Sequence, residues 1–310
     1  MAMKGIERTM KAAQQAATDR PDVLIKAEEI SDVYYARGAS PSLLARRTWN
    51  LLVKAAAGDA WKAERHSIRK RELCAGWHIG PKEISEVLEE LQTTLIKQRI
   101  TSQNNRSAIL TTALLSSTIE ETDNDDTSLV WYRFTPELCE LLRTSKYYVE
   151  LEKLVFLSFQ CKYSHQLYER AVRKLRDKLV IDHIKLEDLR VIFGIEKGTL
   201  TRWQHLKERV IEPAVAEVNH LAPFVVRWQP VASTATKRHN PPVLAVQFTY
   251  APKDTRQAAN ARAELERSRV GRKARREQTV EQIATEDRQQ RAELEADLAT
   301  LPAPRKRSKG

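Results

Sequence analysis

The sequence predicts an α+β fold that is mostly helical, built from two tandem winged-helix domains and a charged C-terminal tail that is helical or disordered. Two observations predict it. A short helical pattern, a turn and a longer helical pattern occur twice, each time followed by two β-prone runs. A helix-turn-helix with a β-hairpin behind it is a winged helix. The length of 310 residues suits two domains.

The first domain is expected over residues 41–146, after a flexible arm of polar, alanine-rich residues 1–40. Its first helix begins after Pro41, since the first N–H groups of a helix have no intrahelical partner and proline is tolerated there. Apolar residues at helical spacing predict a longer helix over residues 82–100. The other predicted elements are a short helix over 69–77, a turn over 78–81 and β-prone runs over 108–119 and 129–134.

The second domain is expected over residues 147–252 and repeats this order. Pro213 lies within a predicted helix over 199–221, and we expect it to bend that helix because proline donates no hydrogen bond. The polar loop 233–242 separates two β-prone runs and predicts a second hairpin. The other predicted elements are helices over 149–159, 164–175 and 186–193, a strand over 179–184, and hairpin strands over 224–230 and 243–250.

Residues 253–310 contain no aromatic residue and are dominated by alanine, glutamate, arginine and glutamine. Their few large apolar residues form no sustained heptads. We therefore expect a charged helix or a disordered tail rather than a core.

The composition favours a polyanionic partner. The 52 Lys and Arg against 41 Asp and Glu give a net charge of +11, and the pI is about 9.5. A basic excess attracts nucleic acid through Coulomb forces and counterion release.

The three cysteines, Cys74, Cys139 and Cys161, are far apart and form no C-x-x-C pair. We therefore expect buried thiols rather than a disulfide or a zinc site, and no metal or cofactor. The N-terminus lacks the apolar stretch of a signal peptide, and no run approaches the ~18 apolar residues of a membrane span. We expect a cytoplasmic protein that does not bind membranes.

Four motifs follow one another in the second domain. They are KYSHQLYE at 162–169, LEDLRVIFGI at 186–195, the set Trp203, Leu206, Lys207, Arg209 and Val210, and PAVAEVN at 213–219. In this order they resemble the replication initiators of iteron-containing plasmids, the Rep family, whose signatures include KYS-x-x-LYE and P-A-x-x-E-[IV]-N. Residues 225–228 and 246–248 resemble the closing hairpin of that family. The resemblance covers about 147–252; the first domain matches only in element order, and the tail has no counterpart.

The resemblance implies two winged helices that bind short direct repeats, called iterons, in double-stranded DNA at a replication origin. It implies opening of the adjacent DNA and recruitment of the host replication initiator and helicase. It also implies dimers that repress the protein's own promoter at an operator inverted repeat, as part of plasmid copy control, and monomers that act at the repeats.

The helix over 199–221 is the expected recognition helix. At 100° per residue, Trp203, Leu206 and Val210 gather on one side, which packs inward. The N-terminal half of the opposite side enters a major groove, where arginine pairs with guanine and glutamine with adenine. The residues predicted to contact bases or nearby phosphates are Thr201, Arg202, Gln204, His205 and Arg209. The alternative is an ordinary solvated helix face.

Further DNA contacts are expected where little sequence information is read. Lys237 and Arg238, beside His239, lie at the predicted hairpin tip and reach the DNA backbone or minor groove. Phosphate-anchoring positions of the first domain, assigned from element order alone, are Arg69, Lys70, Arg71, Lys82 and Ser85. The helix over 82–100 is rich in glutamate, so we expect the first domain to grip the backbone or mediate dimers.

Three other classes of protein compete with the initiator. A winged-helix transcriptional regulator binds DNA in the same way, and only support of origin function separates the two. An enzyme is not expected, because the His-x-His of a rolling-circle nickase, the P-loop of a helicase and the G-x-S-x-G of a hydrolase are all absent. A structural nucleoid protein fits the charge but not the four ordered motifs.

Overall fold

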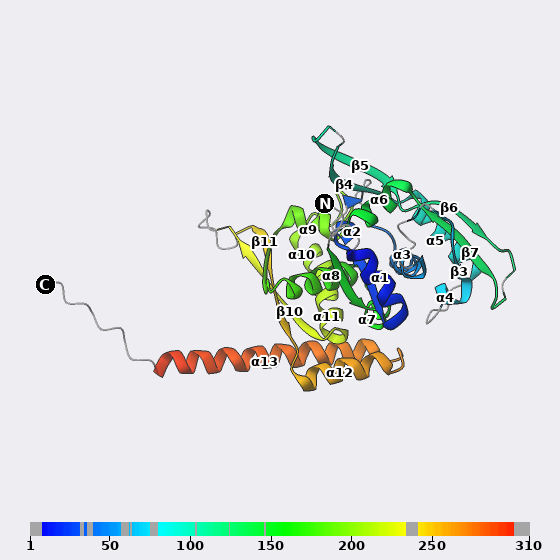
Figure 1. Ribbon diagram of the computed structural model, residues 1–310. Helices are drawn as coiled ribbons and strands as arrows, with labels where there is room; N and C mark the ends of the chain where they lie inside the picture. Colours follow the sequence, from blue (N-terminus) through cyan, green and yellow to red (C-terminus); the bar gives the residue numbers. More distant parts are fainter. Residues whose placement is uncertain are drawn as a thin grey trace. The chain divides into compact units, whose positions relative to one another are not determined.

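In the computed structural model the chain divides into two compact units, Met1–Leu265 and Glu266–Gly310 (Figure 1). The structure describes residues 8–31, 34–35, 40–56, 62, 64–74, 80–102, 104–123, 125–145, 147–233 and 241–300. Within these residues, no helix combines the length and the apolar character that a membrane crossing requires.

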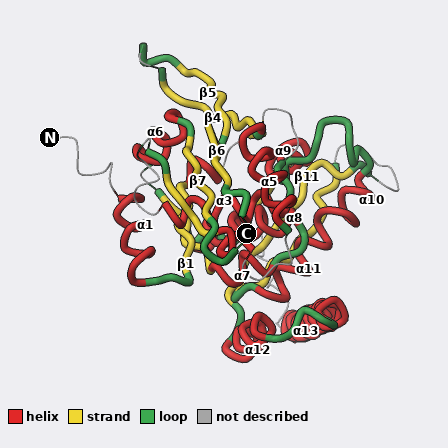
Figure 2. The backbone as a smooth tube through the Cα atoms, turned by 90° about the vertical axis from the view of Figure 1, so that its right-hand side faces the viewer, coloured by secondary structure: helices red, strands yellow, loops and turns green. Residues whose placement is uncertain are grey.

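In its described residues, the first winged helix packs four helices against two small antiparallel sheets. Its elements are α3 (Leu43–Ala56), β3 (His66–Arg69), α4 (Lys70–Cys74), α5 (Pro81–Thr93), β4 (Leu95–Thr101), β5 (Ser107–Ala113), β6 (Leu115–Glu120), β7 (Leu129–Phe134) and α6 (Pro136–Thr144). One sheet has the strand order β2-β4-β5, where β2 is Tyr34–Tyr35, and the other has the order β3-β7-β6. The β4–β5 hairpin extends beyond the neighbouring helices (Figures 1 and 2).

A compact aromatic core holds these elements together. The rings of Trp49 and Phe134 meet edge to face with centroids 5.2 Å apart. Tyr132 is buried beside them and donates its hydroxyl hydrogen bond to the carbonyl of Leu52 at 2.6 Å. The predicted start of the first helix is confirmed, since the Ser42 hydroxyl accepts the N–H of Ala45 at 3.1 Å.

The prediction of one helix over 82–100 is wrong beyond Thr93. Helix α5 ends there, the N–H of Thr94 bonds to the carbonyl of Glu90 at 2.9 Å, and residues 95–101 form β4. The β-prone run 108–119 is two strands in different sheets, β5 paired with β4 and β6 paired with β7. The predicted helix over 69–77 begins one residue later, because Arg69 ends a strand and α4 begins at Lys70; residues 75–77 lie outside the described residues.

The prediction of a flexible arm is wrong for residues 8–31. They form α1 (Arg8–Asp19), β1 (Val23–Ala27) and α2 (Glu28–Ser31), and β1 pairs antiparallel with β8 (Tyr148–Glu152). The hydroxyl of Thr9 is buried and donates to the carbonyl of Ser145 at 3.1 Å. The N-terminal segment therefore joins the first winged helix to the second.

The second winged helix follows the predicted order closely. Its elements are α7 (Lys153–Ser158), α8 (Lys162–Arg176), β9 (Ile181–Lys185), α9 (Leu186–Ile192), α10 (Trp203–Leu206), the π-helical turn η2 (Lys207–Ile211), α11 (Glu212–Leu221), β10 (Phe224–Ala232) and β11 (Val243–Pro252). The strands form one antiparallel sheet of order β10-β11-β9. The expected helix over 149–159 is half wrong, because its first residues are β8.

The N-terminal segment contacts the second winged helix through a buried charged pair as well as through the β1–β8 pair. Lys26 on β1 forms a 2.8 Å ion pair with Glu169 on α8, and both side chains are almost fully buried. The N–H of Ser40 donates to the carbonyl of Gly194 at 3.0 Å.

The second winged helix also includes part of the segment expected to be a tail. Helix α12 (Thr255–Glu266) buries Ala261 and Leu265, and Leu265 belongs to the core of the second winged helix. The Glu264 carboxylate lies 3.4 Å from the imidazole of His220, and both side chains are buried. The charged helix α13 (Arg272–Thr300) lies in the other unit.

Candidate nucleic-acid interface

The helix-turn-helix of the second winged helix begins with α9, which a glycine ends. Gly194 has φ +59, a left-handed conformation that favours glycine, and the N–H of Ile195 reaches back to the carbonyl of Arg190 at 2.8 Å. A Cβ added at Gly194 would lie 2.3 Å from the Cβ of Ser40. The first turn of the motif is thus fixed by its backbone geometry and by its contact with Ser40, which lies just before α3.

Arg190 holds the turn that leads into the recognition helix, and sequence reasoning missed it. Its guanidinium donates to the carbonyls of Leu186, Leu200 and Thr201 at 3.2, 3.3 and 3.2 Å. Leu200 itself has φ +46, an unusual conformation for a branched residue. No sequence motif signals this role, because only the folded turn brings three carbonyls to one guanidinium.

The recognition helix begins later than predicted and contains a π-helical turn. Its first helical residue is Trp203, with Arg202 at the N-cap, so Thr201 and Arg202 precede the helix. The π-helical turn η2 ends just before α11, which carries Pro213 in its first turn. Proline has no N–H to donate to the preceding turn. Its position therefore accounts for a π-helical turn at the place where the sequence predicted a bend.

The two faces of this helix divide as predicted. Leu206, Val210 and Ile211 are fully buried. Trp203 packs against the core, with its ring centroid 6.1 Å from that of Trp228. Of the predicted DNA-contacting residues, Thr201 and Arg202 directly precede the helix and are exposed. On the helix, Gln204 and Arg209 are exposed and His205 is half-buried.

Acidic side chains are interleaved with these cations and amides. The side-chain amide of Gln204 donates to the carboxylate of Glu208. The ammonium of Lys207 lies 3.5 Å from the carboxylate of Glu212. The N-terminal end of the helix, around Arg202, is therefore the most favourable part for a phosphate or a base edge, and the positive charge weakens toward Glu212.

In the first winged helix two of the five predicted anchoring residues are engaged within the fold. Lys70 is buried, and its ammonium forms a 2.9 Å ion pair with Glu120. The hydroxyl of Ser85 donates to the same carboxylate at 2.7 Å. The assignment of Lys70 as a phosphate contact is corrected, because the folded chain already surrounds its charge. The hydrogen bond of Ser85 likewise connects α5 to β6.

The other three predicted anchoring residues of this domain are exposed. Arg69 ends β3, Arg71 lies on α4, and Lys82 opens α5 with its ammonium 3.7 Å from Glu86. The acidic character of α5 is partly structural, since Glu90 accepts the N–H and hydroxyl of Ser42 at 2.6 and 2.7 Å. The predicted hairpin-tip residues Lys237 and Arg238, with His239, lie outside the described residues.

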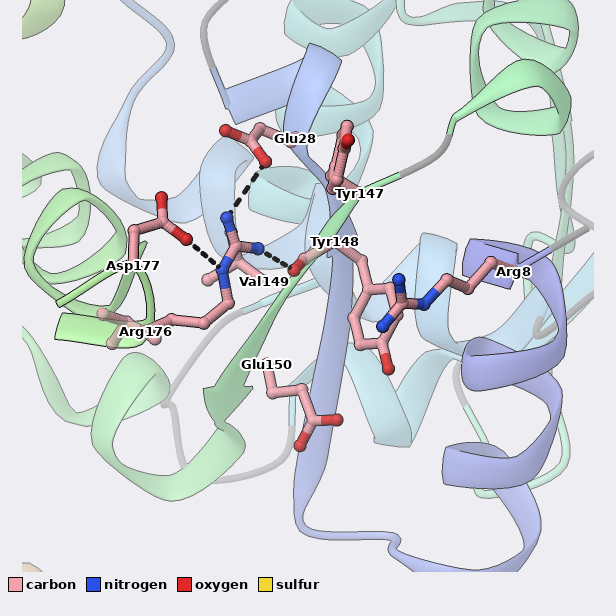
Figure 3. Close-up of a pocket in the computed structure, with 9 residues that line it drawn as sticks. Arg8, Glu28, Tyr147, Tyr148, Val149, Glu150, Arg176 and Asp177 are labelled. Carbon is pink, nitrogen blue, oxygen red and sulfur yellow. Dashed lines mark hydrogen bonds and ion pairs between the residues drawn. The ribbon is translucent and has the colours of Figure 1, made fainter. Parts of the chain in front are cut away.

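A cleft of about 680 Å³ opens where β8 meets α1 and the end of α8 (Figure 3). Arg8, Tyr148 and Arg176 line it. The Arg176 guanidinium is held by Glu28 at 3.2 Å and Asp177 at 2.8 Å, so its charge is balanced by the protein's own carboxylates. We therefore do not place the functional site there.

Burial raises the pKa of the Cys139 thiol to about 11 and also raises the pKa of the Cys161 thiol. Cys74 and Cys161 are partly buried, and no disulfide joins the three cysteines. Among the described residues no cluster of His, Cys, Asp and Glu could hold a metal ion. The exposed face of the second winged helix therefore remains the candidate site.

Comparison with known proteins gives its most direct support to the assignment of the second winged helix. Residues 185–250 match the family model described as initiator Rep protein, WH2, which confirms the resemblance for this part of the chain. No curated protein matches the chain.

Two solved structures of replication proteins match parts of this chain. One is the Pi initiator protein in complex with iteron DNA, with a TM-score of 0.54 and 14% identity over 75% of this chain and 98% of that chain. The other is the WH1 domain of MSBI1.176, a replication protein isolated from a multiple sclerosis patient. It has a TM-score of 0.25 and 14% identity over 33% of this chain and 81% of that chain. The tandem winged-helix prediction is confirmed by the family model and the Pi fold.

Proposed function

We propose that this chain is a plasmid replication initiator that binds short direct repeats in double-stranded origin DNA through its second winged helix. The observation that carries the proposal is the surface formed by the exposed Thr201, Arg202, Gln204 and Arg209 and the half-buried His205, within the segment that matches the initiator WH2 model. The Pi initiator, whose fold is similar, was solved with iteron DNA.

The physical argument for DNA rests on shape and charge together. The buried side of α10 and η2 anchors the helix, while its first exposed residues lie at an N-terminal end that fits the width of a major groove. Arg202 offers a planar pair of donors that matches the acceptors of guanine. The net charge of +11 adds sequence-independent attraction to the phosphates.

The first winged helix has a supporting role in this proposal. Arg69, Arg71 and Lys82 hold the DNA backbone, while the domain also mediates self-association. As a dimer the protein represses its own promoter at an operator inverted repeat, and as a monomer it acts at the repeats and recruits the host initiator and helicase. The protein works in the cytoplasm, without catalysis and without a cofactor.

The test is nuclease protection on the plasmid's own origin region and on a random duplex of equal length, each at two salt concentrations. Periodic protection over direct repeats, retained at the higher salt concentration, supports the proposal. Equal and steeply salt-dependent binding to both duplexes contradicts it.

Protection alone does not separate an initiator from a transcriptional regulator. A plasmid that carries the origin and lacks this gene should replicate only when the chain is supplied in trans. If the repeats are protected and the plasmid still fails to replicate, the regulator is the better description.

A further inference from the structure

The strand β9 of the second winged helix lies at the edge of its sheet. The strand order β10-β11-β9 places β11 on one side of it. In the described part of the chain, no strand pairs with its other side. An edge of this kind presents backbone N–H and C=O groups that can pair with a strand of another chain.

The pairing with β11 shows which backbone groups face outward. The N–H of Tyr250 donates to the carbonyl of Val180 at 2.9 Å, and the antiparallel register continues from this pair along β9. Bonded pairs alternate with non-bonded pairs in an antiparallel ladder, so the bonds to β11 recur at every second residue. The N–H and C=O groups of Ile181 and His183 therefore point away from β11, as does the N–H of Lys185.

The residues at the start of this edge are apolar and exposed. Leu179, Val180 and Ile181 are 51%, 50% and 59% exposed. Consecutive apolar side chains beside an unpaired strand edge favour pairing with another strand. The strand has only five residues and ends in Lys185, and both features limit indiscriminate pairing.

Charges of opposite sign flank β9. Lys178 precedes the strand, and Glu187 and Asp188 follow it in the first turn of α9. All three side chains are exposed, and none of them takes part in an ion pair within the described residues. The edge therefore has a cation at one end and carboxylates at the other.

We propose that β9 is a contact between two copies of this chain, whose β9 edges pair antiparallel about a twofold axis at His183. Ile181 of each copy then lies opposite Lys185 of the other, because both are two residues from the axis. Lys178 of each copy lies toward Asp188 of the other, because both are five residues from it. The contact is thus self-complementary in its backbone groups and in its charges.

This edge suits a second copy better than nucleic acid. Phosphates make no use of the exposed apolar residues 179–181, and the carboxylates of Glu187 and Asp188 repel them. A strand of five residues buries less area than a standard stable interface, so the association should be weak and should depend on concentration. The inference does not rest on the proposed function, since the contact needs no DNA, and it is separate from self-association through the first winged helix.

The first test is disulfide formation at the predicted axis, in the full chain without DNA. Cα atoms of a hydrogen-bonded antiparallel pair are about 5.5 Å apart, within the reach of a disulfide. H183C should therefore form a covalent dimer under mild oxidation. I181C alone and K185C alone should not, whereas an equal mixture of the two should, because the register places these positions opposite each other. The wild type keeps its three cysteines and gives the background.

The second test measures the strength of the contact by sedimentation velocity over a range of concentrations. K178E and D188K should each weaken association roughly five-fold, because the twofold axis repeats each charge change. Mixing the two variants restores opposite charges at both ends and should restore association, as should the double variant K178E/D188K. H183P removes an outward N–H without removing a bond to β11, so it should weaken association, whereas H183T should not.

Several results would overturn the proposal. One is an H183C dimer no more abundant than the wild-type background, and another is equal cross-linking by K185C alone and by the mixture. A third is a mixture of K178E and D188K that associates no better than either variant alone. If H183P associates as strongly as H183T, self-association does not use the β9 edge. Binding of the variants to the origin repeat is measured separately and decides the proposed function whatever the result here.

Discussion

In the first winged helix Lys70 and Ser85 both bond to Glu120 within the fold, whereas in the second winged helix Arg202 and Arg209 are exposed. The two domains have similar elements, and each places polar side chains near its own helix-turn-helix. The difference teaches that element order locates a candidate surface but does not show which of its charges are available. Availability depends on whether a neighbouring carboxylate of the same domain lies within reach.

The largest expected effect concerns the junction of the two domains. G194A should lower the free energy of unfolding by about 2–5 kcal/mol, because alanine there adopts a left-handed backbone and also overlaps Ser40. G198A is a matched control, since Gly198 has φ +87 with nothing within 4 Å of an added Cβ, and it should cost only about 1–2 kcal/mol. Urea unfolding measures both. Equal losses would show that the Ser40 contact is unimportant.

The next prediction sharpens the role of Lys70. K70M should destabilise the protein by about 2–4 kcal/mol, because it leaves Glu120 without its buried cation. DNA affinity, corrected for the folded fraction, should not change. An exposed cation of the same domain gives the control, and K82M should leave stability within about 0.5 kcal/mol. A stable K70M with weakened DNA binding would restore Lys70 as a phosphate contact.

The opposite behaviour is expected at Arg202. R202A should leave the free energy of unfolding within about 0.5 kcal/mol and reduce affinity for the origin repeat by about 1–3 kcal/mol. R202K keeps the charge but not the planar pair of donors, so it should lose specific binding and keep binding to a random duplex. Titration of both duplexes measures this. Equal losses on the two duplexes would reduce Arg202 to a phosphate contact.

The smallest effect is a pH dependence in the second winged helix. Burial raises the pKa of the Asp182 carboxyl, but the nearby charges of Arg170 and Lys174 lower it further. The pKa therefore lies below its usual value. Its stabilising contribution is therefore complete above the unfolded-state pKa of about 3.9 and is lost as pH falls through the lower folded-state pKa. D182N should be less stable than the wild type at neutral pH, and the gap should shrink in acid. Urea unfolding across pH tests this, and a constant gap would contradict it.

Much of the second winged helix could be predicted from local signals. The pattern of 164–175 differs from α8 by two residues at its start and one at its end, and Gly194 marks the end of α9 in both. The inward side of the recognition helix follows from helical spacing alone, because one periodicity places Leu206 and Val210 together. Clear helical periods and turn residues act within a few residues of themselves, so the sequence shows them directly.

Short apolar runs were harder to assign. Residues 95–101 and 148–152 have spacings that fit a helix or a strand, and each became a strand because a partner strand lay beside it. For 148–152 that partner is β1, far away in the sequence. Hydrogen bonds between strands distant in the chain are not encoded in either strand alone.

The sequence by itself determined the basic charge, the order of the second helix-turn-helix and its hairpin, and the sides of the recognition helix, because these depend on composition and short-range periodicity. Only the tertiary structure decided that residues 8–31 join the two domains, that Lys70 is buried against Glu120, and that Arg190 holds three carbonyls before the recognition helix. Each of these depends on groups brought together from separate elements, and burial and pairing of a charge are properties of that assembled environment.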